Sequence, residues 1–132
     1  MDPYGLYWEY SQSTGDLTYV DAETGERYHI DRGYSGQGEG LNNPAMQDEP
    51  DVGPIPQGTY DIGPQRYSPR TGPGVMDLTP RPGTDTFERD FFQIHGDNPC
   101  RCQSASTGCI VLSPNTRRMI NNSGDRELRV VP

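Results

Sequence analysis

The chain has 132 residues, a formal charge of −8 at pH 7 and only 30% hydrophobic residues. This length allows one compact core and excludes a second domain of ordinary size. The negative charge argues against a nucleic-acid backbone or an anionic lipid surface as the main partner, and leaves room for a basic protein partner.

Short alternating runs predict β-strands in the first third of the chain. They cover residues 6–11, 16–21 and 27–30, and turns that contain Gly15 and Gly25 separate them, because glycine tolerates a positive φ. The pattern indicates a meander of hairpins. The eight tyrosines, three phenylalanines and one tryptophan of the chain can each cover one face of such strands.

A long loop is expected next. Residues 34–51 are rich in glycine, asparagine and proline, which predicts a loop longer than compact domains usually carry. Loops of that length are often functional or mobile. If this one covers a site, deleting residues 38–45 should alter substrate selection more than folding.

The middle of the chain predicts further strands among turns. Pro54 and Pro56 preclude a helix, and residues 59–62 alternate as a strand. A second strand is expected at 75–80 within a Pro- and Gly-rich stretch, and residues 89–96 alternate as a third.

The last quarter supplies a buried strand, a helix and a closing strand. Residues 108–113 are short and apolar, which is typical of a buried strand. The one helix candidate is 115–122, capped by Ser113 or Asn115, and residues 127–131 close the sheet. The elements together predict a mainly β, single-domain protein with one or two short helices.

A histidine and a cysteine carry the chemistry. A thiol with an ordinary pKa of about 8.5 is only a few per cent thiolate at neutral pH, so a catalytic cysteine needs a nearby imidazole or positive potential. His95 ends one predicted strand and Cys109 begins another, so adjacent strands can hold them together. Gly108 allows a tight turn whose amides converge on an oxyanion. The pattern predicts acyl transfer, with Cys109 as nucleophile and His95 as base and then acid.

The three cysteines of the chain leave an alternative open. An odd number cannot pair completely, so at least one thiol is free or bound to something else. His95, Cys100, Cys102 and Cys109 could ligate one Zn²⁺, which would make the protein a zinc-stabilised, non-enzymatic module. Cys100 and Cys102 could also form a disulfide or simply pack on a loop. The catalytic interpretation requires no metal and no cofactor.

The cysteine motif resembles that of the L,D-transpeptidases. In those enzymes a histidine precedes Ser/Thr-x-Gly-Cys and a hydrophobic residue, and here His95 precedes the STGCI run at 106–110. The run GPIPQGTY at 53–60 is similar to the Thr-Pro-x-Gly-x-Tyr/Phe signature upstream in the same enzymes. With YSG at 34–36 and NNP at 42–44, the chain looks like the L,D-transpeptidase-like effectors secreted by bacterial type VI systems.

The resemblance implies a fold, a reaction and a set of site residues. It implies an L,D-transpeptidase-like β-sandwich or barrel in which Cys109 attacks a peptidoglycan stem peptide between the third residue, a diamino acid, and the terminal D-alanine. The acyl-enzyme then passes to water, to a D-amino acid or to a second stem. The catalytic residues implied are Cys109, His95, Ser106 and Gly108, and the substrate-binding ones are Tyr34, Ser35 and Thr107. The alternative is a degenerate transpeptidase fold that binds the wall or a partner.

The chain departs from the family pattern at two places. The histidine that usually precedes the Gly-Cys pair is Thr107 here, as is common in the effector branch. The Asn-Arg pair that often follows the cysteine is replaced by Val111 and Leu112, so the arginine that binds the substrate carboxylate cannot be carried over directly. Arg117 and Arg118 lie shortly downstream, and Arg117 is the candidate taken here. A solvated helix face is the alternative for at least one of them.

The beginning of the chain suggests a delivery route. No segment approaches the roughly 18 apolar residues of a membrane span, and the N-terminus lacks a signal-peptide pattern. DPYGL at 2–6 resembles the junction that ends the shell of Rhs-repeat proteins. We therefore expect residues 1–6 to be a junction remnant and 7–132 a catalytic toxin domain. This resemblance implies secretion with the Rhs shell, action in the periplasm of a target bacterium and a cognate immunity protein.

Overall fold

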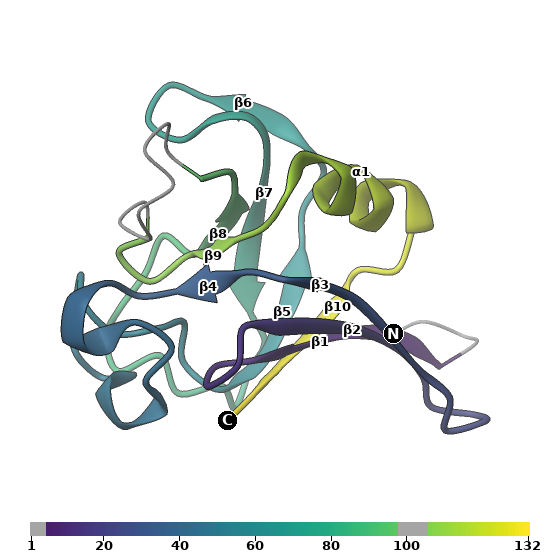
Figure 1. Cartoon of the computed structure of the whole chain (residues 1–132), viewed down its shortest axis with the longest axis horizontal. Coiled ribbons are helices and arrows are strands. Elements are labelled where there is room, and N and C mark those ends of the chain that lie inside the picture. Colours follow the sequence, from purple (N-terminus) through teal and green to yellow (C-terminus); the bar gives the residue numbers. More distant parts are fainter. Residues whose placement is uncertain (1–4, 98–105) are drawn as a thin grey trace.

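The computed structural model describes residues 5–97 and 106–132. Ten strands form one continuous, strongly curled sheet (Figure 1). The strands are β1 (Leu6–Ser11), β2 (Asp16–Asp21), β3 (Arg27–Arg32), β4 (Tyr34–Ser35), β5 (Gly58–Ile62), β6 (Arg66–Ser68), β7 (Gly72–Pro80), β8 (Gln93–His95), β9 (Ile110–Val111) and β10 (Glu127–Val131). The helices are η1 (Gly38–Gly40), η2 (Pro44–Met46) and α1 (Pro114–Ser123). The expectation of a mainly β single domain is confirmed.

The sheet path folds back on itself. Its order is β3-β2-β1-β10-β5-β7-β8-β9-β4, with β6 paired to β7, so its two ends are strands that follow one another in the chain. Gly33 joins them. A Cβ at this position would lie 1.9 Å from the carbonyl oxygen of Val111, so only glycine lets the end of β3 approach β9 this closely.

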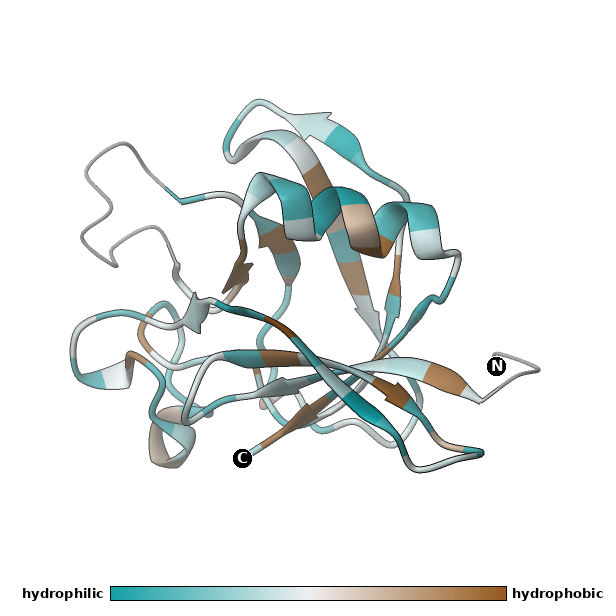
Figure 2. Ribbon diagram, turned by 45° about the vertical axis from the view of Figure 1, so that its right-hand side comes forward, coloured by the Kyte–Doolittle hydropathy of each residue, from teal (hydrophilic) through white to brown (hydrophobic). Residues whose placement is uncertain are grey.

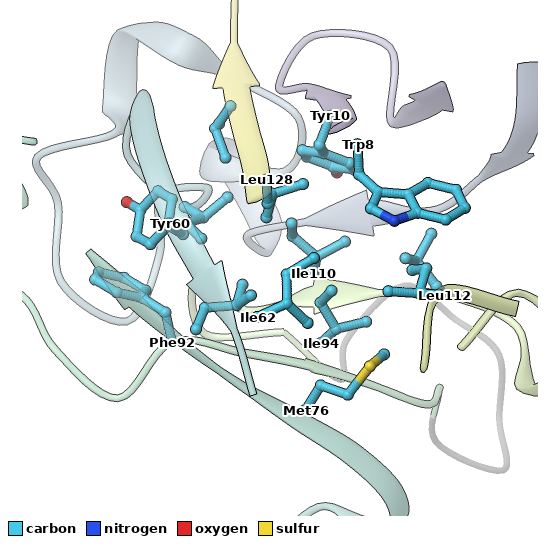
Figure 3. Packing of buried hydrophobic residues seen from close by; sticks show 14 of the residues in the cluster. Trp8, Tyr10, Tyr60, Ile62, Met76, Phe92, Ile94, Ile110, Leu112 and Leu128 are labelled. Atoms are coloured by element: carbon cyan, nitrogen blue, oxygen red, sulfur yellow. The ribbon is translucent and has the colours of Figure 1, made fainter. Parts of the chain in front are cut away.

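The core fills the space inside the curl. The buried cluster draws on strands far apart in sequence, including Trp8, Tyr60, Ile94, Ile110 and Leu128, and their side chains point toward one another in Figure 3. Hydrophobic and hydrophilic residues alternate along the strands (Figure 2). Full burial of such side chains stabilises the fold by about 1.5–3 kcal/mol each, so the core fixes the register of the strands that hold the site.

The helix α1 lies beside β7 (Figures 1 and 2), and Thr116 in its first turn donates to Asp31 of β3 at 2.8 Å. Ser113 caps it by accepting a hydrogen bond from the Thr116 amide, and Gly124 ends it with a φ of 76°. The predicted helix at 115–122 is thus confirmed to within a residue at each end, with Ser113 rather than Asn115 as cap. Within the described residues, no helix has the length and apolar character needed to span a membrane.

The segment 34–51 is more structured than a loop. It contains β4, η1 and η2, and β4 pairs with β9 in antiparallel fashion. Asn42 accepts a hydrogen bond from the Ser35 amide through Oδ1 at 3.1 Å, and Asn43 caps η2. The composition of this segment predicted turns, and it could not reveal the pairing of β4 with a strand so distant in sequence.

The strands beside the chemistry are shorter than the alternation predicted. The strand expected at 89–96 begins only at Gln93, because Phe91 adopts a positive φ of 61°. The strand expected at 108–113 is reduced to the two residues of β9. The residues before both strands therefore belong to turns, and these turns shape the site.

Candidate active site

The pairing of β8 with β9 brings His95 and Cys109 to one face of the sheet. The two strands run parallel, with Ile94 opposite Ile110 and His95 opposite Val111. Side chains two positions apart share a face of a strand, so Cys109, Gln93 and His95 face the same way. All three line one open cavity. The expectation that neighbouring strands hold the histidine and the cysteine together is met.

The cavity has a volume of about 300 Å³. Its walls come from four segments: the end of the 34–51 segment, the β6–β7 turn, the turn before β8 and the cysteine turn. The lining residues are Pro50, Asp51, Ser68, Arg70, Thr71, Glu88, Arg89, Asp90, Phe91, Phe92, Gln93, His95, Thr107, Gly108 and Cys109. The mixture of charged, aromatic and apolar residues suits an amphipathic substrate such as a peptide.

The main chain orients His95. The imidazole is buried, with 3% of the residue exposed, and its Nδ1 lies 2.8 Å from the Gly96 carbonyl oxygen. Because a carbonyl can only accept, Nδ1 carries the proton and Nε2 is left as an acceptor. Burial lowers the pKa of His95, a shift that the Gly96 hydrogen bond opposes. At neutral pH the imidazole is therefore a neutral base.

Cys109 is a free thiol at the floor of the cavity, with 9% of the residue exposed. Its Sγ lies 3.6 Å from the Phe91 carbonyl oxygen and donates to it. Burial raises the pKa of Cys109, whereas the Gln93 amide and the charges of Arg70 and Arg89 act in the opposite direction. The cysteine and the histidine thus rest as a neutral pair, and the thiol must lose its proton as it attacks.

Ser106 holds the cysteine turn together. Its fully buried hydroxyl donates to the Cys109 carbonyl oxygen at 2.6 Å and accepts from the amides of Gly36 and Gly108 at 2.9 and 3.1 Å. The hydroxyl therefore has one donated and two accepted bonds, which is its full capacity. Its contacts tie the turn to the segment after β4 and are those of a positioning residue.

A buried arginine that the sequence did not single out joins two walls of the cavity. Arg89 is 8% exposed, and its guanidinium donates to the carbonyl oxygens of Gln47, Gly53, Pro54 and Thr107. A Cβ on Gly108 would lie 2.2 Å from Arg89 Nη2, and Gly108 has a φ of 129°. Glycine at 108 therefore serves both the turn and the close approach of this charge.

Two residues expected to bind substrate lie behind the site. Tyr34 is buried and donates through its hydroxyl to Asp97 Oδ1 at 2.7 Å. Ser35 is fully buried, and its Oγ accepts from the Ile55 amide at 2.8 Å. Neither lines the cavity in the described structure. Both support the strands and turns from which the lining residues project.

The remaining candidates divide between the cavity and its surroundings. Thr107 is exposed and lines the cavity. Arg117 is buried and donates to the carbonyl oxygens of Leu112, Pro73 and Gly74, so its contacts clamp α1 to β7. Arg118 is exposed on α1 and does not line the cavity.

Two of the three cysteines, Cys100 and Cys102, lie outside the described residues. The zinc and disulfide alternatives both involve them and stay predictions. Arg89 stands in an alternating run and Arg70 in a Pro- and Gly-rich stretch, so the sequence pattern marks neither as a site residue. Arg89 lies far upstream of Cys109 in the sequence, so only the fold shows its contact with the cysteine turn.

Residues 29–132 match the model of the Tlde1 domain. No match was found among curated protein sequences. The fold is similar to that of several solved wall enzymes at low sequence identity. The catalytic domain of the Enterococcus faecium L,D-transpeptidase has 13% identity and a TM-score of 0.54, over 99% of this chain and 100% of that one.

Two longer proteins are also similar in fold. L,D-transpeptidase 1 of Mycobacterium tuberculosis has 17% identity and a TM-score of 0.58, over 97% of this chain and 62% of that one. Bd1075 of Bdellovibrio bacteriovorus has 12% identity and a TM-score of 0.61, over 96% of this chain and 47% of that one. The chain thus spans between about half and two thirds of the length of these relatives. The similarity establishes an L,D-transpeptidase-like catalytic-domain fold.

Proposed function

The chain belongs to the Tlde1 domain family, a family of type VI secretion L,D-transpeptidase effectors, and we propose that it is a cysteine enzyme that removes or exchanges the terminal D-alanine of peptidoglycan stem tetrapeptides. The observation that carries the proposal is the common face of His95 and Cys109 in one open cavity. A thiol nucleophile and a neutral imidazole that can accept its proton are the two groups that acyl transfer by a cysteine requires.

The proposed reaction has two steps. Cys109 Sγ bonds to the carbonyl carbon of the third stem residue while its proton passes to His95 Nε2. The C–N bond to D-alanine then breaks, and His95 gives this proton to the leaving amine. Water or the amine of a D-amino acid next attacks the thioester, the C–S bond breaks, and a proton returns to Cys109 through His95. Water gives L,D-carboxypeptidase activity and the amine of a D-amino acid gives exchange. An amine of a second stem that attacks the thioester in the same way gives crosslinking.

The cysteine turn is the proposed site of oxyanion stabilisation. The Gly108 amide already donates to Ser106 Oγ at 3.1 Å, so its contribution requires that this bond be shared with the oxyanion. The guanidinium of Arg89, packed against Gly108, adds a fixed positive charge to the same turn. Preorganised charge of this kind stabilises a developing anion in a site that excludes water.

The proposed biological role is that of an antibacterial toxin. Membership of an effector family supports secretion and action on a target cell wall. Trimming or capping tetrapeptide stems would remove substrate needed for wall crosslinking. We further propose delivery as the C-terminal toxin of an Rhs protein, action in the target periplasm and neutralisation by a cognate immunity protein in the producer. The junction motif at 2–6 that supports the Rhs context lies largely outside the described residues.

Product analysis tests the proposed chemistry. Purified disaccharide-tetrapeptides are incubated with wild type, Cys109→Ala and His95→Ala, with and without a free D-amino acid, and the products are analysed by mass spectrometry. Wild type is expected to release D-alanine or to exchange it. In both variants the rate of this reaction should fall by about a thousandfold or more. D-alanine release by Cys109→Ala at the wild-type rate would overturn the proposal.

Periplasmic expression tests the proposed role. The chain is expressed in a susceptible bacterium with a periplasmic signal, beside a cytoplasmic form and beside periplasmic Cys109→Ala. Growth arrest is expected only for the periplasmic wild type, because peptidoglycan stems are reached only there. Equal toxicity of the Cys109→Ala form would contradict a toxin that acts by wall chemistry.

A further inference from the structure

Most arginine side chains of the described residues are committed to internal partners. Those that donate to carboxylates are Arg27, Arg32, Arg66, Arg81 and Arg129. Those that donate to main-chain carbonyls are Arg89, Arg117 and Arg126. Within residues 5–97 and 106–132, Arg70 and Arg118 have no side-chain partner, and of these two only Arg70 lines the cavity.

The β6–β7 turn holds Arg70 at the edge of the cavity. Ser68 Oγ accepts hydrogen bonds from the amides of Arg70 and Thr71, both at 3.3 Å. This fixes the main chain of the turn and leaves the exposed guanidinium free to meet a ligand. The neighbouring Arg66 offers a contrast, because its Nε and Nη2 donate to the two carboxylate oxygens of Asp77 at 2.6 and 2.9 Å and its Nη1 donates to the Tyr67 carbonyl oxygen.

The charge of Arg70 reaches both reacting groups. It favours the thiolate of Cys109 and disfavours the protonated form of His95. Arg70, His95 and Cys109 line the same cavity. The guanidinium can therefore meet a negatively charged group of a ligand that reacts there.

The rest of the cavity rim repels anions. Asp51, Glu88 and Asp90 line it, and the other lining arginine, Arg89, already donates through both terminal nitrogens to main-chain carbonyl oxygens. A carboxylate that enters the cavity therefore has one favourable position among the described residues. Arginine suits such a group because its planar fork can donate two parallel hydrogen bonds to it.

We propose that Arg70 binds the α-carboxylate of the D-amino acid that leaves or enters in the reaction. The inference rests on the proposed function and supplies the carboxylate-binding residue that the cysteine motif lacks. The leaving amine must lie beside His95, which protonates it, and its carboxylate is only one carbon further away. An incoming D-amino acid presents its amine and carboxylate in the same relation, so one arginine serves both directions.

The test removes the charge from the substrate and the arginine in turn. Release of D-alanine from a tetrapeptide is compared with release of D-alaninamide from its C-terminal carboxamide, for wild type, Arg70→Gln and Arg70→Lys. Wild type is expected to prefer the carboxylate by about tenfold to a hundredfold in kcat/KM, as for a charge-assisted hydrogen bond. Arg70→Gln should lose this preference because kcat/KM falls for the carboxylate substrate and stays unchanged for the carboxamide. Arg70→Lys should recover part of the preference.

Arg118→Gln is the matched control, because Arg118 is equally unpaired among the described residues but lies on α1 outside the cavity. It should keep the wild-type preference. An Arg70→Gln variant that slows both substrates equally, or a wild type without any preference, would overturn the proposal.

A binding measurement separates this proposal from the proposed function. In a Cys109→Ala background, calorimetry compares the affinities of the tetrapeptide and its carboxamide with and without Arg70→Gln. If the tetrapeptide binds more tightly than its carboxamide and Arg70→Gln removes this difference, the subsite is supported. This holds even if wild type turns over neither substrate, a result that would contradict the proposed reaction but not the subsite. Equal affinities would sink the subsite, whatever the turnover.

Discussion

Two walls of the cavity are built in opposite ways. The wall formed by the cysteine turn and the end of the 34–51 segment is held by buried polar groups, chiefly the Arg89 guanidinium and the Ser106 hydroxyl. The wall formed by the β6–β7 turn is exposed and short, and its β6 strand has an irregular register with β7. It carries Arg70, whose side chain has no partner within residues 5–97 and 106–132.

The contrast separates two tasks of an enzyme site. The reacting thiol needs a position fixed to a fraction of an ångström, and satisfied buried hydrogen bonds supply this rigidity. A group that binds part of the substrate must be reachable from solvent before the substrate arrives, and the substrate then displaces its water. An exposed guanidinium meets this requirement. We therefore expect substitutions in the first wall to change stability and substitutions in the second to change specificity.

The largest effect on stability is expected at Arg89. Arg89→Ala leaves four main-chain carbonyls without their donor and should lower the free energy of unfolding by at least about 3 kcal/mol. Arg89→Lys should recover little of this loss, because one ammonium cannot reproduce the fork. Denaturant unfolding measures both, with Arg70→Ala as the control expected within about 0.5 kcal/mol of wild type. Equal losses at the two arginines would erase the distinction between the walls.

A smaller loss is expected at Ser106. Ser106→Ala removes a hydroxyl that serves Gly36, Gly108 and Cys109, and it should cost about 2 kcal/mol together with most of the activity, since the cysteine turn loosens. Its neighbour Thr107 is exposed, and Thr107→Ala should stay within about 0.5 kcal/mol. A stable but inactive Ser106→Ala would instead indicate a direct chemical role for the hydroxyl.

A still smaller loss of stability is expected at Tyr34, whose partner Asp97 follows shortly after His95. Tyr34→Phe removes the hydrogen bond to Asp97 at 2.7 Å and is expected to cost about 1 kcal/mol. Because Tyr34 lies outside the cavity, KM for the stem peptide should change less than kcat. A rise in KM with unchanged kcat would mean that Tyr34 contacts substrate, as the family resemblance implied.

The smallest expected effect is on the pH dependence of folding. Burial holds the folded-state pKa of His95 below its ordinary value of 6.5, so the unfolded chain binds more protons below pH 6.5. The free energy of unfolding should therefore fall as the pH drops from 6.5 toward the folded-state pKa, and remain unaffected by this group at higher pH. Unfolding curves of wild type and His95→Gln at pH 7 and 5.5 isolate the effect. A wild type that gains stability on this acidification, relative to His95→Gln, would contradict a neutral buried imidazole.

The same shifts predict a broad pH profile of activity. A neutral imidazole and a neutral thiol are both required, and burial holds the pKa of His95 below its ordinary value and raises the pKa of Cys109 above its ordinary value. We expect kcat/KM to be level across neutral pH. An acid limb at or above pH 6.5 would indicate an exposed, ordinary histidine.

Local patterns carried much of the fold prediction. Alternation and turn glycines located the β1–β3 meander, and the serine cap located α1. The pairing of the two-residue β4 with β9 could not be found, because it depends on contacts between distant segments. The positive φ of Phe91 was equally invisible, since nothing in an alternating run marks the residue where it breaks.

The motif allowed the relative placement of His95 and Cys109 to be predicted. The order of His95 and Cys109 pointed to neighbouring strands, and the structure has them. The arginines were not predictable from spacing. Arg117 was chosen for its position after the cysteine, yet its donors meet the carbonyls of β7 and Leu112. Arg70 lies far upstream, and only the fold brings its turn beside the thiol.

The most direct test of the central claim is the trapping of a thioester on Cys109. Wild type is mixed with stem tetrapeptide, quenched in acid after milliseconds to seconds, and examined by intact-protein mass spectrometry and peptide mapping. The account predicts an adduct with the mass of the stem minus D-alanine, located on Cys109 and absent from Cys109→Ala. Release of D-alanine with no adduct, or with an adduct on another residue, would contradict it.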